Sequence, residues 1–373
     1  MSRSSNAISR RSFAQILGAG AALAAMRPAF ALAPAPRFSR PLVNGLVRLS
    51  ANENPYGPSQ MAFKAIEDNL KVSNRYPDHQ EHPLIEELAR INNVKPENII
   101  VGAGSGEILK LCVAAFSGPG RKVVMADPTF ESVGQHASAS KAEVVKIKLT
   151  DDFRHDLLKM GAVPGSGFIY VCNPNNPTAS LTPKHEVREF LAKVPRDTIV
   201  LIDEAYYHFV ETDDYETVIP LISKYPNLVV ARTFSKVYGM AGLRCGYCVA
   251  QPDLVKRMNE HRFFQSVSVL TLTAALASLK DQSQVTNGVR WNADAKKYVY
   301  TELDKLGYRF IPSSANFLMI DLKKPVKPSI QAMRENGVEV GRVFPALPNH
   351  MRVSIGTMPE METFMAAFRK VMA

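Results

Sequence analysis

Ile199-Val200-Leu201-Ile202-Asp203-Glu204 is an apolar run that ends in two acids, and it decides the fold class. A strand without polar alternation is buried on both faces, which is typical of a parallel sheet covered by helices. Similar short runs before and after it are separated by helical patterns. They predict strands at Val123–Ala126, Val144–Leu149, Phe168–Cys172, Leu228–Ala231 and Tyr247–Ala250. Residues 95–250 therefore predict an α/β fold with a mostly parallel sheet flanked by helices.

Asp203 ends the apolar run, at the sheet edge where α/β proteins gather their ligands. An apolar strand followed by Asp-Glu also resembles the magnesium-binding strand of P-loop ATPases, but the chain contains no Gly-Lys-Ser or Gly-Lys-Thr. A buried carboxylate needs a partner. Asp203 is therefore interpreted either as a ligand-binding acid with a cationic partner or as the cap of the next helix.

A glycine turn, Gly102–Glu107 (GAGSGE), follows the predicted strand Ile99–Val101 and begins the clearest helix of the chain. Free N–H groups and the helix dipole converge at such a turn, so it favours an anion. Glu107 stands where a dinucleotide fingerprint needs its last glycine, which argues against a dinucleotide site. The open alternatives are an anion site and a generic tight turn.

A third candidate is Thr233-Phe234-Ser235-Lys236, which directly follows the predicted strand Leu228–Ala231, with Arg244 eight residues later. Most lysines are solvated, but apolar neighbours lower the pKa of a lysine and favour its nucleophilic amine. An anion-binding turn, an acid at a strand end and a shielded lysine are the groups that pyridoxal phosphate requires.

With these motifs, the chain resembles the fold-type-I pyridoxal-phosphate aminotransferases, specifically the histidinol-phosphate aminotransferase-like group. Matching stretches run from Leu49–Gly57 (LSANENPYG) to Met351–Thr357 (MRVSIGT). The most specific pieces are Ser235–Tyr247 (SKVYGMAGLRCGY), Asn173–Thr178 (NPNNPT) and Asp203–Tyr206 (DEAY). The resemblance implies a large domain with a mostly parallel sheet and a smaller α+β domain.

The resemblance also implies roles for individual residues. Lys236 would form the Schiff base with the cofactor and later move a proton, and Asp203 would keep the pyridinium nitrogen protonated. Tyr206 and Asn176 would hydrogen-bond the phenolic oxygen, and Phe130 would stack on the ring. The residues implied to hold the phosphate are Gly104, Ser105, Gly106, Thr233, Ser235, Arg244 and, from a neighbouring subunit, Tyr76, which implies a homodimer.

For the substrate, the resemblance implies that Arg352 binds the α-carboxylate, together with Asn176, and that Arg342 matches an arginine that binds a distal phosphate. The implied activity moves an amino group between an L-amino acid, or histidinol phosphate, and a 2-oxo acid. Ala179 replaces the glycine that usually ends the Asn-Pro-Thr-Gly motif, and Gly106 stands where Asp or Asn is common. A decarboxylase or lyase, or a noncatalytic binder of pyridoxal phosphate, is the alternative.

The first 33 residues are predicted to be a signal peptide. Arg10 and Arg11 form a twin-arginine pair, an uncharged stretch follows, and small residues mark cleavage near Ala31 or Ala33. The stretch is too short for a membrane-spanning helix. We expect export to the periplasm by the twin-arginine route and no membrane attachment after cleavage.

The remaining chain is predicted to contain an N-terminal arm (34–75) that joins the small domain, a large cofactor-binding domain (76–275) and a small C-terminal domain (276–373). This division rests on the pattern of predicted elements, which changes beyond about residue 275. A long polar helix is predicted near Val289–Leu306, strands follow at Phe317–Leu322 and Met351–Ile355, and a capping box at Thr357–Glu360 precedes the last helix.

Charge and cysteine usage add two expectations. The formal net charge is +10, but the basic residues are scattered, so the charge alone is weak evidence for nucleic acid and suits an anionic ligand as well. Cys245 and Cys248 lie three apart on a predicted strand and so point to opposite faces. Buried thiols are therefore favoured over a disulfide, and no metal site is expected.

Overall fold

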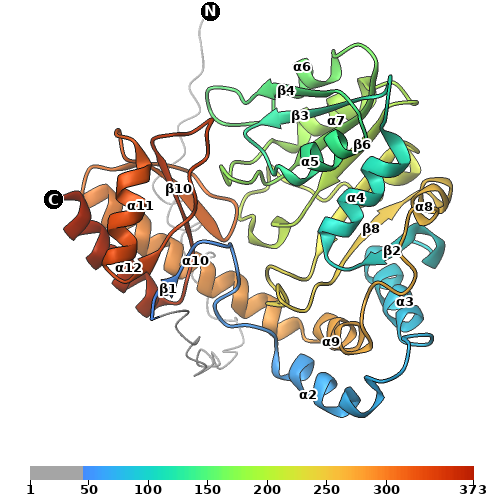
Figure 1. Cartoon of the computed structure of the whole chain (residues 1–373), viewed down its shortest axis with the longest axis horizontal. Coiled ribbons are helices and arrows are strands. Elements are labelled where there is room, and N and C mark those ends of the chain that lie inside the picture. Colours follow the sequence, from blue (N-terminus) through green and yellow to red (C-terminus); the bar gives the residue numbers. More distant parts are fainter. Residues whose placement is uncertain (1–44) are drawn as a thin grey trace, which may run out of the picture. The chain divides into compact units, whose positions relative to one another are not determined.

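Seven strands form one large sheet in the computed structural model, which describes residues 45–373 (Figure 1). In spatial order they are β2 (Ile99–Gly102), β8 (Gly246–Ala250), β7 (Leu228–Thr233), β6 (Ile199–Asp203), β5 (Ser166–Cys172), β3 (Lys122–Asp127) and β4 (Val144–Lys148). Strands β3 to β7 pair in parallel, and β8 runs antiparallel to both of its neighbours. The predicted α/β fold with a mostly parallel sheet is confirmed.

Each face of the large sheet is covered by its own helices. One core cluster joins the sheet to α4 (Ser105–Phe116), α5 (Ser132–Ala139) and α8 (Pro252–Asn259). The opposite cluster joins it to α3 (Glu81–Asn92), α6 (Leu157–Gly161), α7 (Lys184–Lys193) and α9 (Val269–Lys280), and α2 (Gln60–Asn69) packs against α9. Leu201 belongs to the first cluster and Val200 and Ile202 to the second, so β6 is buried on both faces.

The C-terminal part has a separate core. An antiparallel sheet of β12 (His350–Ser354), β10 (Phe317–Asp321) and β9 (Arg309–Ile311) packs with α10 (Gln282–Lys305), α11 (Val326–Glu335) and α12 (Met358–Met372). The predicted capping box is present, because Thr357 and Glu360 bond each other's main chain. Helix α10 begins seven residues before the predicted Val289, since the Asp281 side chain accepts a hydrogen bond from the Gln284 N–H and caps it there.

The beginning of the described chain lies against this C-terminal core. Strand β1 (Val47–Arg48) pairs in parallel with β11 (Val338–Glu339), and Leu49 is buried in the same cluster as β10 and β12. The chain then crosses to the large sheet through Asn52. Short 3₁₀ turns complete the described elements: η1 (Leu70–Val72), η2 (Pro96–Asn98), η3 (Tyr207–Phe209) and η4 (Ile219–Ser223). The domain limits drawn from the sequence stay predictions, and the proposed signal peptide lies outside the described residues.

The four cysteines are buried and unpaired. Cys245 belongs to one core cluster of the large sheet and Cys248 to the other, so the expectation of buried thiols on opposite faces is confirmed. Within residues 45–373, no helix combines the length and apolar character of a membrane span, and no group of acidic, histidine or cysteine side chains is arranged to hold a metal ion.

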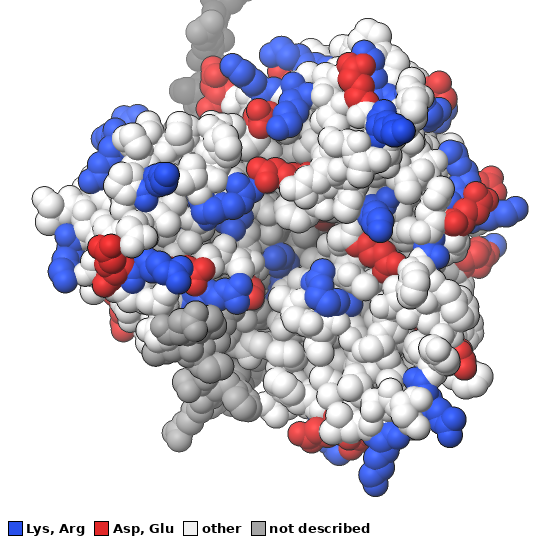
Figure 2. All heavy atoms as spheres, viewed as in Figure 1, with Lys and Arg blue, Asp and Glu red and all other residues white. Residues whose placement is uncertain are grey.

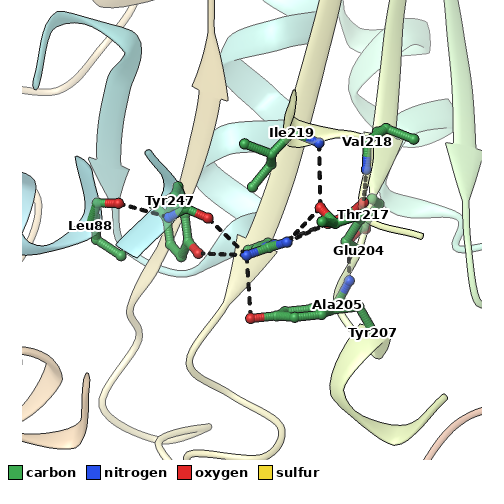
Figure 3. A network of polar contacts seen from close by, with 11 residues as sticks. Leu88, Glu204, Ala205, Tyr207, Thr217, Val218, Ile219 and Tyr247 are labelled. Carbon is green, nitrogen blue, oxygen red and sulfur yellow. Dashed lines mark hydrogen bonds and ion pairs between the residues drawn. The ribbon is translucent and has the colours of Figure 1, made fainter. Parts of the chain in front are cut away.

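A buried ion pair ties the end of β6 to β7. Arg232 donates from Nε and Nη2 to Oε2 of Glu204 at 3.0 and 2.9 Å, and both side chains are almost fully buried. Thr217, Tyr207 and Tyr247 surround the same guanidinium (Figure 3). The two acids that end the apolar run therefore have different surroundings. Glu204 is bonded within this network, while Asp203 lines a cavity at the end of the strand.

Candidate active site

A cavity of about 380 Å³ opens where the parallel strands β5, β6 and β7 end. Its lining comes from segments far apart in the sequence. The predicted site residues that line it are Ser105, Gly106, Phe130, Asn176, Asp203, Tyr206, Thr233, Ser235, Lys236, Arg244, Arg342 and Arg352. Gly104 and Tyr76 are not part of this lining. On the face shown in Figure 2, basic and acidic side chains are interspersed, without a continuous basic patch.

Lys236 is partly buried in the loop after β7, and its Nζ donates to the main-chain oxygen of Asn52 at 3.1 Å. Burial, reinforced by the positive charge of Arg352, lowers the pKa of Lys236 to about 8. Asn52 has a left-handed backbone (φ 53°) and is buried, and its N–H donates to Ser354 Oγ at 2.7 Å. The arm thus supplies the group that holds the lysine amine.

Asp203 ends β6 as a buried carboxylate whose hydrogen bonds come from uncharged donors. The Tyr170 hydroxyl donates to Oδ2 at 3.0 Å and the Ala205 N–H to Oδ1 at 3.1 Å. Burial raises the pKa of Asp203 to about 6. A cation placed against this carboxylate would restore its ionised form, so the position suits a positively charged ring nitrogen.

Tyr206 and Asn176 lie on the cavity wall beside these charges. The Tyr206 hydroxyl oxygen accepts from Asn52 Nδ2 at 3.2 Å, and burial raises the Tyr206 pKa, so the phenol keeps its proton and can donate it to a ligand. The Lys236 Nζ lies 5.3 Å from the centre of the Tyr206 ring. Asn176 Oδ1 accepts from Arg352 Nη1 at 2.9 Å.

An anion cradle, formed by Ser105, Gly106, Thr233, Ser235 and Arg244, makes up one end of the cavity. Arg244 Nη1 donates to the Ala241 carbonyl at 2.9 Å and approaches Ser235 Oγ at 3.4 Å. Ser105 begins α4, so its first turn presents unpaired N–H groups. A Cβ at Gly104 would lie 2.2 Å from Arg244 Nη2, so only glycine lets the guanidinium lie against this turn. Gly104 therefore leaves room for Arg244 in the cradle without lining the cavity itself.

Arg352, on β12, is held by two hydrogen bonds. Its Nη1 bonds Asn176, its Nη2 donates to the Ser50 carbonyl at 2.7 Å, and its buried Nε has no partner among the described residues. Burial, with the charge of Arg342, lowers the pKa of Arg352. A Cβ on Gly341 would meet Arg352 O at 2.9 Å, so glycine allows the Arg342 segment to pass this closely.

Arg342 lines the cavity as one half of an ion pair. Its Nη2 lies 2.6 Å from Glu131 Oε2, and its Cζ lies 4.4 Å from the centre of the Phe344 ring. Arg352 Cζ lies 5.0 Å from the same ring. Glu131 follows Phe130, the exposed aromatic expected to stack on the cofactor, in the loop between β3 and α5.

Ala179 stands where the family motif usually has glycine. Its φ is 59°, in the left-handed region that glycine adopts without cost and that costs alanine about 1 kcal/mol. Ala179 is buried, its N–H donates to Asn175 O and its carbonyl accepts from Ser314 N–H, both at 2.8 Å. These bonds hold the turn that carries Asn176 in spite of the missing glycine.

Sequence reasoning missed four residues that shape the cavity: Asn52, Glu131, Tyr170 and Phe344. Tyr170 left a signal, because a tyrosine inside an apolar strand needs a hydrogen-bond partner. Asn52 lies inside a motif that carried the resemblance, but nothing in the sequence indicated its contact with Lys236. Nothing in the sequence indicated that Glu131 and Phe344 would lie in the cavity.

The lining fits pyridoxal phosphate. It offers a cradle for a dianion, a buried acid without a cationic hydrogen-bond partner, an exposed aromatic ring and a lysine amine of lowered pKa. The residues that could hold the phosphate, the ring nitrogen and the aldehyde are the anion cradle, Asp203 and Lys236, respectively.

Comparison with known proteins agrees with this geometry. Residues 44–368 match the family model of aminotransferase class I and II. The chain is 36% identical over 336 residues to a histidinol-phosphate aminotransferase of Moorella thermoacetica, covering 89% of this chain and 86% of that protein. It is also 36% identical over 331 residues to the Bacillus subtilis histidinol-phosphate aminotransferase, covering 88% and 92%.

Among solved structures, the chain is similar to histidinol-phosphate aminotransferase from Sinorhizobium meliloti in complex with pyridoxal-5'-phosphate. The TM-score is 0.81 at 29% identity, and the match covers 87% of this chain and 90% of the other.

Proposed function

This chain belongs to the aminotransferase class I and II family and is a pyridoxal-phosphate-dependent transaminase, and from that premise we propose that Lys236 is its catalytic amine. The observation that carries the proposal is the Lys236 amine itself. It is partly buried, its pKa is about 8, and it shares one cavity with Asp203 and the anion cradle. The proposed activity moves an amino group between an L-amino acid and a 2-oxo acid.

When bound, pyridoxal phosphate supplies an aldehyde that accepts an amino group and a ring that withdraws electrons from the donor Cα. Asp203 would hold the ring nitrogen protonated, and Tyr206 and Asn176 would hydrogen-bond the phenolic oxygen. Phe130 would cover the ring face. These groups are fixed before the donor arrives, which is how a site stabilises charge that develops in a transition state.

Lys236 would act first as the nucleophile that holds the aldehyde and then as the base that moves the donor's Cα proton. Its lowered pKa suits both roles, because a sizeable fraction of the amine is neutral near pH 8. The Asn52 carbonyl at 3.1 Å would keep the amine oriented between these steps.

Arg352 would bind the donor's α-carboxylate with its guanidinium, because the residue lines the cavity. Asn176 would fix the guanidinium. Because similar proteins are named for histidinol phosphate, we propose that compound as one candidate donor, with the half-exposed Arg342 at its phosphate.

A screen of donors tests the function. We expect the purified protein to carry an absorbance band from bound pyridoxal phosphate that is lost when a productive amino acid or histidinol phosphate is added and regained with a 2-oxo acid. Each reaction should release a 2-oxo acid from an amino acid donor or the matching ketone from histidinol phosphate. Release of carbon dioxide would favour a decarboxylase, and a band that no donor changes would favour a noncatalytic binder.

We further propose a homodimer in which Tyr76 reaches the phosphate of the neighbouring subunit. Tyr76 is 78% exposed and lies outside the cavity of its own chain. Phe263 and Phe264, 76% and 80% exposed, belong to a loop tied to the Tyr76 segment by a hydrogen bond from Arg262 to Glu81 at 2.5 Å. Three large exposed rings on adjoining segments suit burial against a second copy.

Mixed dimers test this arrangement. Tyr76→Phe should weaken cofactor binding by about 10-fold, the loss of one hydrogen bond to a charged group. Mixing it with Lys236→Ala should restore native affinity and turnover in one of the two sites, since that site combines Lys236 of one chain with Tyr76 of the other. Lack of recovery in a verified mixed dimer would show that Tyr76 does not serve the neighbour.

We also propose that residues 1–33 direct export through the twin-arginine route to the periplasm, supported by the Arg10-Arg11 pair and the small residues before Ala33. N-terminal sequencing of the mature protein from a periplasmic fraction checks this. A mature chain that still begins at Met1 in the cytoplasm would contradict it.

A further inference from the structure

Glu131, which forms an ion pair with Arg342, has no part in the proposed chemistry. Both side chains line the cavity, and both are about half exposed, at 46% and 53%. The other basic side chains of the lining have separate proposed roles. Lys236 is the catalytic amine, Arg244 belongs to the anion cradle and Arg352 would bind the α-carboxylate.

Two of the five N–H groups of Arg342 are engaged while this pair is formed. Its Nη2 bonds Glu131 at 2.6 Å and its Nη1 donates to the Val343 carbonyl at 3.0 Å. A carboxylate or phosphate binds arginine best through two parallel N–H groups. Such a group would compete with Glu131 for the N–H groups of Arg342.

The position of the Glu131–Arg342 pair indicates which part of a donor would contact it. The guanidinium carbons of Arg342 and Arg352 lie 4.4 and 5.0 Å from the centre of the Phe344 ring. A donor whose α-carboxylate binds Arg352 would therefore bring its side chain, and not its α-carbon, toward Arg342 and Glu131.

We infer that Glu131 is a specificity-determining residue that competes with the distal carboxylate or phosphate of a donor for Arg342. This inference rests on the proposed function and adds a substrate preference to it. Glu131 neutralises Arg342, so a donor with an uncharged distal end meets a balanced pair. A donor with a distal anion must displace Glu131 and then lie near its negative charge.

The experiment compares glutamate with glutamine, two donors of equal length that differ in distal charge. The measured quantity is the ratio of their kcat/KM values in the first half-reaction. Glu131→Gln keeps the size of the side chain and removes its charge. It should raise the glutamate-to-glutamine ratio by about fivefold, the scale expected for a half-exposed ion pair, and leave glutamine nearly unchanged.

Two further variants make the outcome specific. Arg342→Gln should lower the ratio, and Glu131→Gln should then have no further effect, because the residue it competes for is gone. Glu216→Gln is the matched control: Glu216 also pairs with an arginine, Arg188, but does not line the cavity. It should leave the ratio at the wild-type value.

An unchanged or lower ratio in Glu131→Gln overturns the inference. So does an equal rise in the Arg342→Gln background, which would indicate a general charge effect. If the wild-type protein used neither donor, the wider donor screen would decide the proposed function separately. Inhibitor binding would still test Glu131, since Glu131→Gln should tighten glutarate relative to pentanoate and an unchanged ratio of their affinities would refute its role.

Discussion

Lys236→Ala should abolish transamination, with a fall in turnover on the order of 10⁴-fold or more, because the variant loses the nucleophile and the proton carrier together. The anion cradle and Asp203 remain, so pyridoxal phosphate should still bind, but without a covalent link. Borohydride reduction followed by peptide mapping should leave a pyridoxyl group on Lys236 in the wild type and none in the variant. A tag on another lysine would show that the assignment is wrong.

Lys296→Ala is the matched control. Lys296 is a buried lysine, with its Nζ 3.0 Å from the Ser313 carbonyl and 3.0 Å from Glu211, and it does not line the cavity. Its loss should lower thermal stability and leave the borohydride tag on Lys236.

The Lys236 pKa gives this prediction a pH dependence. Only the neutral amine attacks an aldehyde, and burial holds the pKa near 8. The rate at which the cofactor-free protein takes up pyridoxal phosphate should therefore rise with pH through about 8 and level off above it. A rate that keeps rising to pH 10, as for an exposed lysine, would contradict the burial of this amine.

Asp203→Asn should lower kcat/KM by about 10²–10³-fold, the range seen when one fixed group that stabilises developing charge is removed. Asparagine keeps the shape of the side chain and cannot hold a ring nitrogen protonated. Spectroscopic titration should also show weaker cofactor binding, which separates this effect from a defect in the chemical step.

The Asp203 pKa near 6 predicts how cofactor affinity changes with pH. Above pH 6 the carboxylate is already ionised and can pair with the ring nitrogen. Below pH 6 it is protonated and must first release that proton, so affinity should fall as the pH drops. This dependence should be absent in Asp203→Asn, and its persistence there would assign it to another group.

Tyr170→Phe is the control for Asp203. It removes the hydroxyl that donates to Oδ2 at 3.0 Å and leaves the carboxylate in place. We expect a loss of about 10-fold, well below that of Asp203→Asn, because one hydrogen bond to a charged group contributes about 1.5 kcal/mol.

The sequence determined the fold class and most of the cavity lining. The run Ile199–Asp203 has no polar alternation, and such a strand can only be buried between two layers of helices. Parallel strands end at one edge, so acids, hydroxyls and amines that follow them in the sequence meet there. This physical rule brings Asp203 and Lys236 into one cavity although 32 residues separate them.

Only the tertiary structure decided how these groups are held and which charges oppose one another. The carbonyl of Asn52 contacts Lys236 across a sequence separation of 184 residues, and Glu131 contacts Arg342 across 211. Neither contact follows from a local pattern, because hydrophobic periodicity and turn residues specify elements but not which loops of two separate cores face each other. The lysine pKa and the competition for Arg342 arise from that packing.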